Sequence, residues 1–301
     1  MSLRAAPPRD RTGRTTDWEQ EIERRIVGRS AALQRVRQRA LALRTLRLPV
    51  LLRGEAGTGR RHIARVLHAL AGSTRELVVV SPHDPLARAP EARHAYFLEE
   101  VTQLPPTEQA RWSELSRRVE QGREDAPLRI FAASAFDLAR LARAGEFDAA
   151  FAGRLLRFCL DLPPLRERPE DVPDLARSLA DRAADRIGRS RVVLTTPALR
   201  QLAGQSWPGN VRELAAVIER LVAFCRGDRI SRGDVMAVLD EAPLGVVSSR
   251  RLHHRRQREE LIALIDEAGG NLAEVARRLQ MSRGGVIYRA QKFGLLPKRA
   301  S

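Results

Sequence analysis

The sequence has few cysteines, almost no lysine and no long apolar stretch. Its only two cysteines, Cys159 and Cys225, rule out a disulfide framework, and both lie in apolar periodic segments, so we expect buried free thiols in a reducing cytoplasm. No apolar run approaches the ~20 residues that a membrane-spanning helix needs. The first residues, MSLRAAPPRDRTGRTTD, lack the apolar core of a signal peptide and are typical of a disordered tail. These absences exclude a disulfide-rich secreted domain and favour a folded cytoplasmic protein.

Lysine occurs only at positions 292 and 298, and arginine supplies the rest of the 53 basic residues. With 37 acidic residues the formal net charge is +16, which favours a polyanionic partner. A codon bias is the alternative explanation, since it would account for arginine in place of lysine. It does not account for clustering: residues 249–301 hold 12 basic and 5 acidic residues, a net charge of +7, and both lysines. The distribution therefore favours a polyanionic partner for this last region, and the motifs of the same region, described below, indicate double-stranded DNA.

Five short apolar runs alternate with segments of helical period in the first half of the chain. They predict buried strands at Leu48–Leu52, Leu77–Val80, Ala95–Leu98, Leu128–Ala132 and Phe158–Leu162. This alternation is typical of an α/β fold with a parallel five-stranded sheet and helices on both faces.

Beyond about Pro169 the strand signals stop, and four helical patterns predict a separate all-helical subdomain. They cover Val172–Ile187, Pro197–Gln205, Asn210–Cys225 and Ser231–Leu239. Pro243 and Gly245 indicate a linker before a last compact helical region. The predicted organisation is a disordered tail over 1–24, an α/β subdomain over 25–168, a helical subdomain over 169–240, a linker over 241–255 and a DNA-binding domain over 256–298.

A glycine-rich loop stands between the first predicted strand and a helical segment over His62–Leu70. Its residues are Gly54, Glu55, Ala56, Gly57, Thr58, Gly59, Arg60 and Arg61. In this context backbone N–H groups and the helix N-terminus converge on phosphate groups, so the loop predicts nucleotide binding. The usual loop ends in Lys, which reaches the outer phosphates, followed by Ser or Thr, which holds Mg²⁺. Arginine at both positions argues against efficient hydrolysis.

The last helical region has the pattern of a helix-turn-helix. A first helix over Arg256–Ala268 ends at two glycines, and Asn271 is placed to cap a second helix that runs through Leu279. A third helix over Arg283–Phe293 is expected to direct Val286, Ala290 and Phe293 inward.

The remaining positions of that third helix and its cap are left to contact phosphates or base edges. They are Ser282, Arg283, Tyr288, Arg289, Gln291 and Lys292. The alternative is a small helical dimerisation hairpin with a solvated charged face.

Several segments together resemble the sigma-54-dependent transcription activators, or bacterial enhancer-binding proteins, of the AAA+ ATPase class. They are IVGRS (26–30), the glycine-rich loop, YFLEEVTQLP (96–105), LPPLRERPEDVP (162–173), WPGNVREL (207–214) and GGNLAEVARRLQMSRGGVIYRAQKFGL (269–295). The resemblance runs in collinear order over residues 25–296, and its last segment resembles a Fis-type helix-turn-helix.

The resemblance implies an α/β AAA+ P-loop core, an all-helical lid subdomain and a C-terminal helix-turn-helix. It implies ATP or ADP as ligand, Mg²⁺ as its companion ion, and self-association to a dimer or a larger assembly. It also implies RNA polymerase as a partner and a bacterial, nucleoid-associated location in the cytoplasm.

The resemblance also assigns roles to single residues. Glu100 matches the water-activating carboxylate, and Arg154 matches one of two arginine fingers, the arginines that a subunit directs at its neighbour's nucleotide. Glu99 and Arg212, which matches the second sensor arginine, complete the nucleotide-binding set with the loop. No residue is assigned with confidence as a metal ligand.

Other positions depart from the family's pattern. Arg60 and Arg61 replace Lys and Glu, and Glu99 replaces an Asp, so that one extra methylene should misplace Mg²⁺. Ala135 replaces a polar Asn, and Asp148 replaces the first arginine finger, which reverses the charge meant to stabilise the transferring phosphoryl group. Together these changes predict a degenerate AAA+ module.

The family's GAFTGA motif, which presses on sigma-54, is absent from the sequence. Its absence argues against conventional remodelling of a sigma-54 complex. We therefore expect a sequence-specific DNA-binding regulator with a nucleotide-sensing or assembly-forming AAA+ module. The alternatives are an active ATPase that activates sigma-54-dependent transcription and an interaction subunit that modulates hexamers of an intact relative.

Overall fold

The chain divides into two compact units, Met1–Asp240 and Glu241–Ser301. The computed structural model describes residues 18–73, 75–82, 94–225 and 227–240 of the first unit. In the second unit it describes residues 261–262, 264–265, 267–268, 271–279, 286, 290 and 295. Within these ranges no helix is both long enough and apolar enough to cross a membrane.

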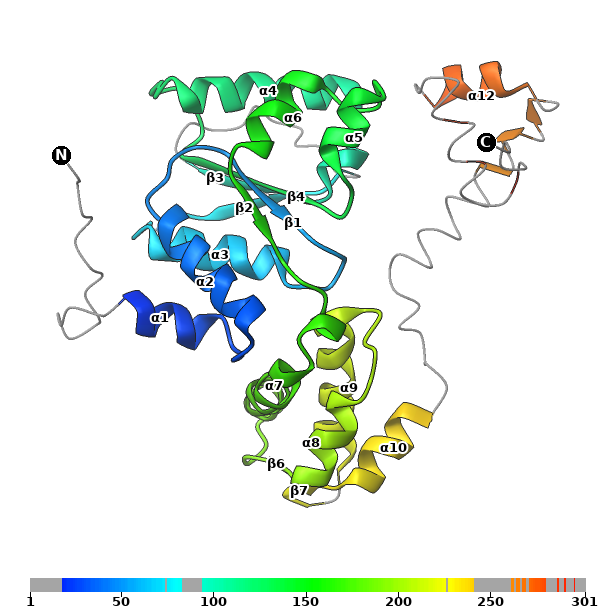
Figure 1. Ribbon diagram of the computed structural model, residues 1–301. Helices are drawn as coiled ribbons and strands as arrows, with labels where there is room; N and C mark the ends of the chain where they lie inside the picture. Colours follow the sequence, from blue (N-terminus) through cyan, green and yellow to red (C-terminus); the bar gives the residue numbers. More distant parts are fainter. Residues whose placement is uncertain are drawn as a thin grey trace. The chain divides into compact units, whose positions relative to one another are not determined.

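A five-stranded parallel sheet forms the centre of the first unit (Figure 1). Its strands lie in the order β2-β3-β4-β1-β5, and their bounds are β1 Val50–Arg53, β2 Leu77–Val80, β3 Ala95–Leu98, β4 Arg129–Ser134 and β5 Cys159–Asp161. All five predicted strands are present, with ends shifted by at most two residues. They read as continuous apolar runs because the sheet is covered on both faces.

Successive residues of one strand point into two different cores. Leu51 packs with α4, α5 and α6, whereas Leu52 packs with α1, α2 and α3. Figure 1 shows these helices as two layers on opposite faces of the sheet. Their bounds are α1 Trp18–Arg25, α2 Ala31–Leu43, α3 Arg60–Leu70, α4 Pro106–Glu120, α5 Leu138–Arg143 and α6 Ala149–Leu156.

Helix α1 corrects the predicted tail, which was wrong for residues 18–24. Ile22 is buried in the core beside α2 and α3, Trp18 packs against the same core, and the Arg44 guanidinium lies 5.3 Å from the Trp18 ring centroid. Trp18, Ile22 and Ile26 recur every four positions, so one face of this short helix is apolar.

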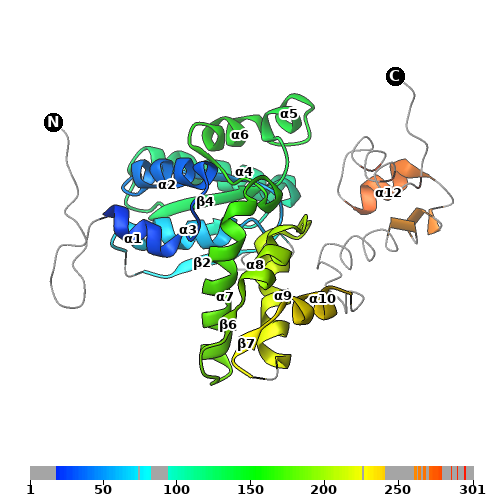
Figure 2. The ribbon, with the colours of Figure 1, turned by 60° about the horizontal axis from the view of Figure 1, so that its bottom comes forward.

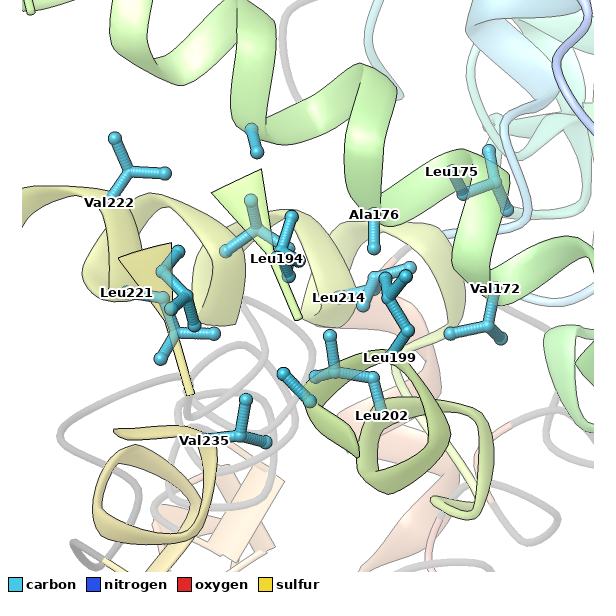
Figure 3. Packing of buried hydrophobic residues seen from close by; sticks show 14 of the residues in the cluster. Val172, Leu175, Ala176, Leu194, Leu199, Leu202, Leu214, Leu221, Val222 and Val235 are labelled. Atoms are coloured by element: carbon cyan, nitrogen blue, oxygen red, sulfur yellow. The ribbon is translucent and has the colours of Figure 1, made fainter. Parts of the chain in front are cut away.

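Four helices form the lid subdomain: α7 Val172–Arg186, α8 Thr196–Ala203, α9 Asn210–Phe224 and α10 Arg232–Asp240. Helices α7 and α9 pack against each other (Figures 1 and 2), and Figure 3 shows the apolar side chains between the elements, among them Ala176, Leu214 and Leu221. The prediction that this subdomain is all-helical was wrong in one detail. Two-residue strands, β6 Val193–Leu194 and β7 Arg229–Ile230, pair in parallel, and runs so short leave no periodic signal.

Asp171 ties the lid to the α/β subdomain. Its carboxylate is fully buried and accepts hydrogen bonds from Arg29 N (2.6 Å), Ser30 N (2.7 Å) and Ser30 Oγ (2.8 Å). Gly28 has φ +141°, and an added Cβ there would lie 2.6 Å from the Asp171 carboxyl carbon, so only glycine fits at this position. The start of α2 and the start of α7 are therefore held together by one carboxylate.

In the second unit, helix α12 spans Leu272–Arg278, and Asn271 caps it by accepting from the N–H groups of Ala273 and Glu274. The predicted cap is confirmed. Val286 and Ala290 are helical and fully buried in a small core with Leu261 and Val275, which confirms the predicted inward direction of these two residues.

Candidate functional site

The glycine-rich loop joins the end of β1 to the start of α3, as predicted. Gly57 has φ +84° and Gly59 has φ +104°, values that L-residues with a Cβ rarely adopt. Thr58 closes the turn on Glu55, whose carbonyl accepts from Thr58 N (3.3 Å) and Thr58 Oγ1 (2.8 Å). Gly59 caps α3 without a side-chain hydrogen bond, and an added Cβ there would meet nothing within 4 Å. The first N–H groups of α3 are thus free to bind phosphate.

The lid packs directly on this loop through Gly209 and Asn210. An added Cβ on Gly57 would lie 2.1 Å from the Gly209 carbonyl oxygen, so only glycine allows this approach. Asn210, which is fully buried, donates from Nδ2 to Ala56 O (3.0 Å) and accepts at Oδ1 from Leu165 N (2.7 Å). Asn210 was not predicted from the sequence as a link between the two subdomains.

Two arginines of the lid side lie next to the loop. Arg166 pairs with the Glu55 carboxylate at 2.7 Å, on the solvent-facing side. Arg212 lies in the first turn of α9, and its Cβ is 3.3 Å from the position of an added Cβ on Gly57. Within the described part of the chain Arg212 makes no hydrogen bond or ion pair, so its guanidinium is available to a bound anion.

The carboxylate of Glu100 is held by the arginine of the loop. Glu100 Oε2 lies 3.1 Å from Arg60 Nη1, and both side chains are largely buried, with 13 % and 14 % of their surface exposed. Thr102 Oγ1 donates to Oε1 (3.0 Å), and Ala135 N donates to both oxygens (3.0 and 3.2 Å). Charged hydrogen bonds of this kind are about twice as strong as neutral ones.

Strand topology explains why these groups meet. Strands β1, β3 and β4 are parallel neighbours in the sheet, so their carboxyl ends lie at one edge, where ligands of such sheets bind. Arg60 follows β1, Glu100 follows β3 and Ala135 follows β4. The backbone N–H of Ala135 contacts Glu100 even though the alanine lacks a polar side chain, a role that reading side chains alone does not reveal.

Glu99 has a different environment from Glu100. Its carboxylate lies 3.6 Å from Arg61 Nη1, and 40 % of its side chain is exposed against 48 % for Arg61. Exposed pairs of this kind contribute about 0–1 kcal/mol. The carboxylates of Glu99 and Glu100 are therefore paired with the two arginines of the loop.

The residues present fit a nucleotide phosphate chain but not its usual metal ion. Mg²⁺ takes oxygen ligands in near-ideal octahedral geometry. The two carboxylates of the site are engaged by guanidinium groups, and Arg61 offers no oxygen ligand. Among the described residues no group of three or more His, Cys, Asp or Glu side chains could hold a metal ion.

Asp148, which the resemblance matches to the first arginine finger, has a structural role. It caps α6: its Oδ1 accepts from Phe151 N (2.6 Å), and its own N–H donates to Gln109 Oε1 (2.8 Å). Its carboxylate thus serves to cap the N-terminus of α6.

Arg154 is paired within its own chain. Its Nη1 lies 2.5 Å from Glu120 Oε2, and Arg157 binds the other oxygen of the same carboxylate. Glu120 was not predicted from the sequence as a partner of Arg154. The pair holds Arg154, which the resemblance matches to the second finger, against the end of α4.

The two cysteines are free, as predicted, but half-buried instead of fully buried. Burial and the nearby Asp161 raise the pKa of the Cys159 thiol to about 11, so this group remains protonated at neutral pH. A thiol in that state is a poor nucleophile.

The predicted DNA contacts are Ser282, Arg283, Tyr288, Arg289, Gln291 and Lys292. All six lie outside the described residues. Their described neighbours Val286 and Ala290 are fully buried.

Three family models match consecutive parts of the chain. The sigma-54 interaction domain matches residues 27–165, the AAA+ ATPase lid domain residues 166–247, and the bacterial regulatory protein, Fis family, residues 255–293.

Curated relatives match most of the chain. The transcriptional regulatory protein ZraR of Klebsiella oxytoca is 31% identical over 304 residues, which cover 89% of this chain and 68% of the relative. The formate hydrogenlyase transcriptional activator of Salmonella typhimurium (strain SL1344) is 30% identical over 308 residues, 90% of this chain. The chain spans only 44% of that activator's length.

Among solved structures, NtrX from Brucella abortus in complex with ATP has a TM-score of 0.57 and 25% identity, with 89% of this chain and 69% of that chain covered. The same protein in complex with ADP has a TM-score of 0.58 and 24% identity, with coverages of 91% and 71%. Both are similar to this chain in fold over most of its length.

Proposed function

This chain belongs to the family of sigma-54-dependent transcription activators, and from that premise we propose a sequence-specific DNA-binding regulator whose AAA+ module binds nucleotide without hydrolysing it efficiently. The observation that carries the proposal is the Glu100 carboxylate, which the loop arginine Arg60 binds at 3.1 Å.

A general base must be within reach of the water whose proton it takes. Glu100 instead accepts hydrogen bonds from Thr102 and the Ala135 backbone as well as from Arg60. These contacts occupy both oxygens of the carboxylate, so neither oxygen is placed to accept a proton from an attacking water.

Charge stabilisation of the transferring phosphoryl group is also reduced. In phosphoryl transfer most of the catalysis comes from positioning and from cations around the phosphoryl oxygens. Asp148 adds a negative charge at one finger position, and Arg154 is bound to Glu120 at the other. Loss of one such donor typically costs about 10²–10³ in rate.

The DNA-binding part of the proposal rests on the C-terminal region. The match to the Fis family over residues 255–293 coincides with the net charge of +7 over residues 249–301. An assembly of at least two chains would place two recognition helices on paired half-sites. Nucleotide in the AAA+ module would then favour or disfavour that assembly.

A binding experiment tests the DNA-binding part. Purified protein should retain labelled chromosomal fragments at defined sites, and its affinity should fall steeply as the salt concentration rises. The double substitution Arg289→Ala with Lys292→Ala should remove this binding, whereas Arg140→Ala on α5 should leave it unchanged. Absence of salt-sensitive binding would refute the proposal.

The second candidate is an active ATPase that activates sigma-54-dependent transcription. Arg212, whose Cβ lies beside the loop and whose side chain has no hydrogen bond or ion pair among the described residues, and the retained Glu100 favour it. Phosphate release that exceeds the rate of the Glu100→Gln variant would establish it. The third candidate, a subunit that modulates hexamers of an intact relative, has Arg154 as its motivation, as a group offered to a neighbour. The pair of Arg154 with Glu120 in its own chain does not favour this candidate.

A further inference from the structure

The loop and the two carboxylates form a charge arrangement that requires no metal ion. We propose that this site binds a nucleoside diphosphate without Mg²⁺, and that the Glu100 carboxylate takes the place next to Arg60 that a third phosphate would need. The inference rests on the proposed nucleotide binding of the AAA+ module and is independent of DNA binding.

The net charge of the site supports the first part. Three cations, Arg60, Arg61 and Arg212, lie at the loop or beside it, and two acids, Glu99 and Glu100, face them, which leaves a net charge of +1 with no metal present. Arg168, which donates to the loop carbonyl of Thr58 (3.3 Å), is balanced by Asp171 and does not change this sum. Glu55, the other acid of the loop, is neutralised by Arg166. An anion therefore finds a cationic site in the protein itself.

The position of Glu100 supports the second part. Its carboxylate lies 3.1 Å from Arg60 in the first turn of α3 and is anchored by the N–H of Ala135 and the hydroxyl of Thr102. The Glu100 carboxylate is thus an anion of the protein itself, and it occupies the place next to Arg60 where the outermost phosphate of a triphosphate would otherwise bind. A triphosphate must displace it or bear its repulsion in a poorly solvated place, whereas a diphosphate ends earlier on the free N–H groups of the loop.

Calorimetric titration of the whole chain measures both parts of the inference. The ligands are ADP and a non-hydrolysable ATP analogue, each with excess Mg²⁺ and with excess EDTA. We expect the ADP affinity to agree within about twofold between the two conditions. ADP should bind about tenfold more tightly than the triphosphate analogue, the size of effect that about 1.4 kcal/mol of repulsion produces.

Two variants and a control make the test specific. Glu100→Gln keeps the shape of the side chain and removes its charge, so the triphosphate analogue should gain about tenfold in affinity while ADP changes less than about twofold. Arg60→Lys combined with Arg61→Glu and Glu99→Asp restores the family's residues and should make binding depend on Mg²⁺. Glu108→Gln, on α4 and away from the loop, should change neither affinity.

Three results would overturn the inference: loss of ADP binding in EDTA, tighter binding of the triphosphate than of ADP by the unaltered chain, or no binding of either nucleotide. Circular dichroism before each titration confirms that the variants are folded. The DNA-binding assay is carried out without nucleotide, so its outcome distinguishes failure of this inference from failure of the proposed DNA-binding role.

Discussion

Replacement of Asp171 by alanine should separate the lid from the α/β subdomain. The substitution leaves the N–H groups of Arg29 and Ser30 and the Ser30 hydroxyl without their acceptor. It also removes the carboxylate nearest the buried guanidinium of Arg168, whose Nη1 lies 3.9 Å from Asp171 Oδ2. The pKa of Arg168 is already lowered by burial, which shows that its charge is poorly solvated.

The expected cost follows from these contacts. A hydrogen bond to a charged group contributes about 1.5–3 kcal/mol, and loss of one partner of a buried ion pair costs about 3–5 kcal/mol. The effects overlap, so we expect the free energy of unfolding to fall by about 3–5 kcal/mol, a large part of the ~5–15 kcal/mol of a typical domain. Asp171→Asn keeps one acceptor oxygen and should lose about half as much.

Urea denaturation followed by tryptophan fluorescence measures this cost, because Trp112 lies in the α/β core and Trp207 in the lid. Asp174→Ala is the matched control: its half-exposed carboxylate pairs with Arg29 and Arg177 on the surface and should cost less than about 1 kcal/mol. A loss below about 1 kcal/mol for Asp171→Ala, or an equal loss for both variants, would refute the reasoning.

Three further predictions concern single contacts. Asn210→Ala leaves Leu165 N unpaired and should lower the free energy of unfolding by about 2 kcal/mol, as measured by urea denaturation. The control Gln205→Ala should lower it by less than about 0.5 kcal/mol. Equal losses for the two variants would contradict this prediction. Asp148→Arg should lower the free energy of unfolding by about 1 kcal/mol, because α6 loses its cap, and it should not raise the rate of phosphate release. Asp148→Asn should keep the cap and the stability. A higher rate of phosphate release from Asp148→Arg would count against the account. Because the pKa of the Cys159 thiol is about 11, its alkylation at pH 8 should be about 100-fold slower in the native chain than in urea. Mass spectrometry measures both rates. Comparable rates would be inconsistent with the burial of this thiol.

The sequence predicts the α/β core well because its strands are buried on both faces. Each strand reads as a continuous apolar run, and Leu51 and Leu52 are both apolar because each faces a different helical layer. The lid strands β6 and β7 have only two residues each, so no period can be read from them. Helix α1 was missed because a charged, short segment beside a polar tail resembles that tail in composition, although its apolar spacing was present.

The candidate site was predicted in its residues but not in its contacts. Sequence motifs place Arg60 and Glu100 in one site, yet only the strand order brings them to 3.1 Å. The N–H of Ala135 is a backbone donor, which no comparison of side chains reveals. The cap formed by Asp148, in contrast, could have been predicted from the sequence, because an aspartate directly before an apolar helical run is a recognisable helix start. That signal would have explained the residue without reference to a lost arginine finger.

The rate of phosphate release from ATP is the most direct test of the central claim that the AAA+ module binds nucleotide without efficient hydrolysis. It is measured on the whole chain, with Mg²⁺ and with and without bound DNA, beside the Glu100→Gln variant. The account predicts the same rate for both proteins within error, because Glu100 is already bound by Arg60. A rate for the unaltered chain about tenfold or more above that of Glu100→Gln would contradict it.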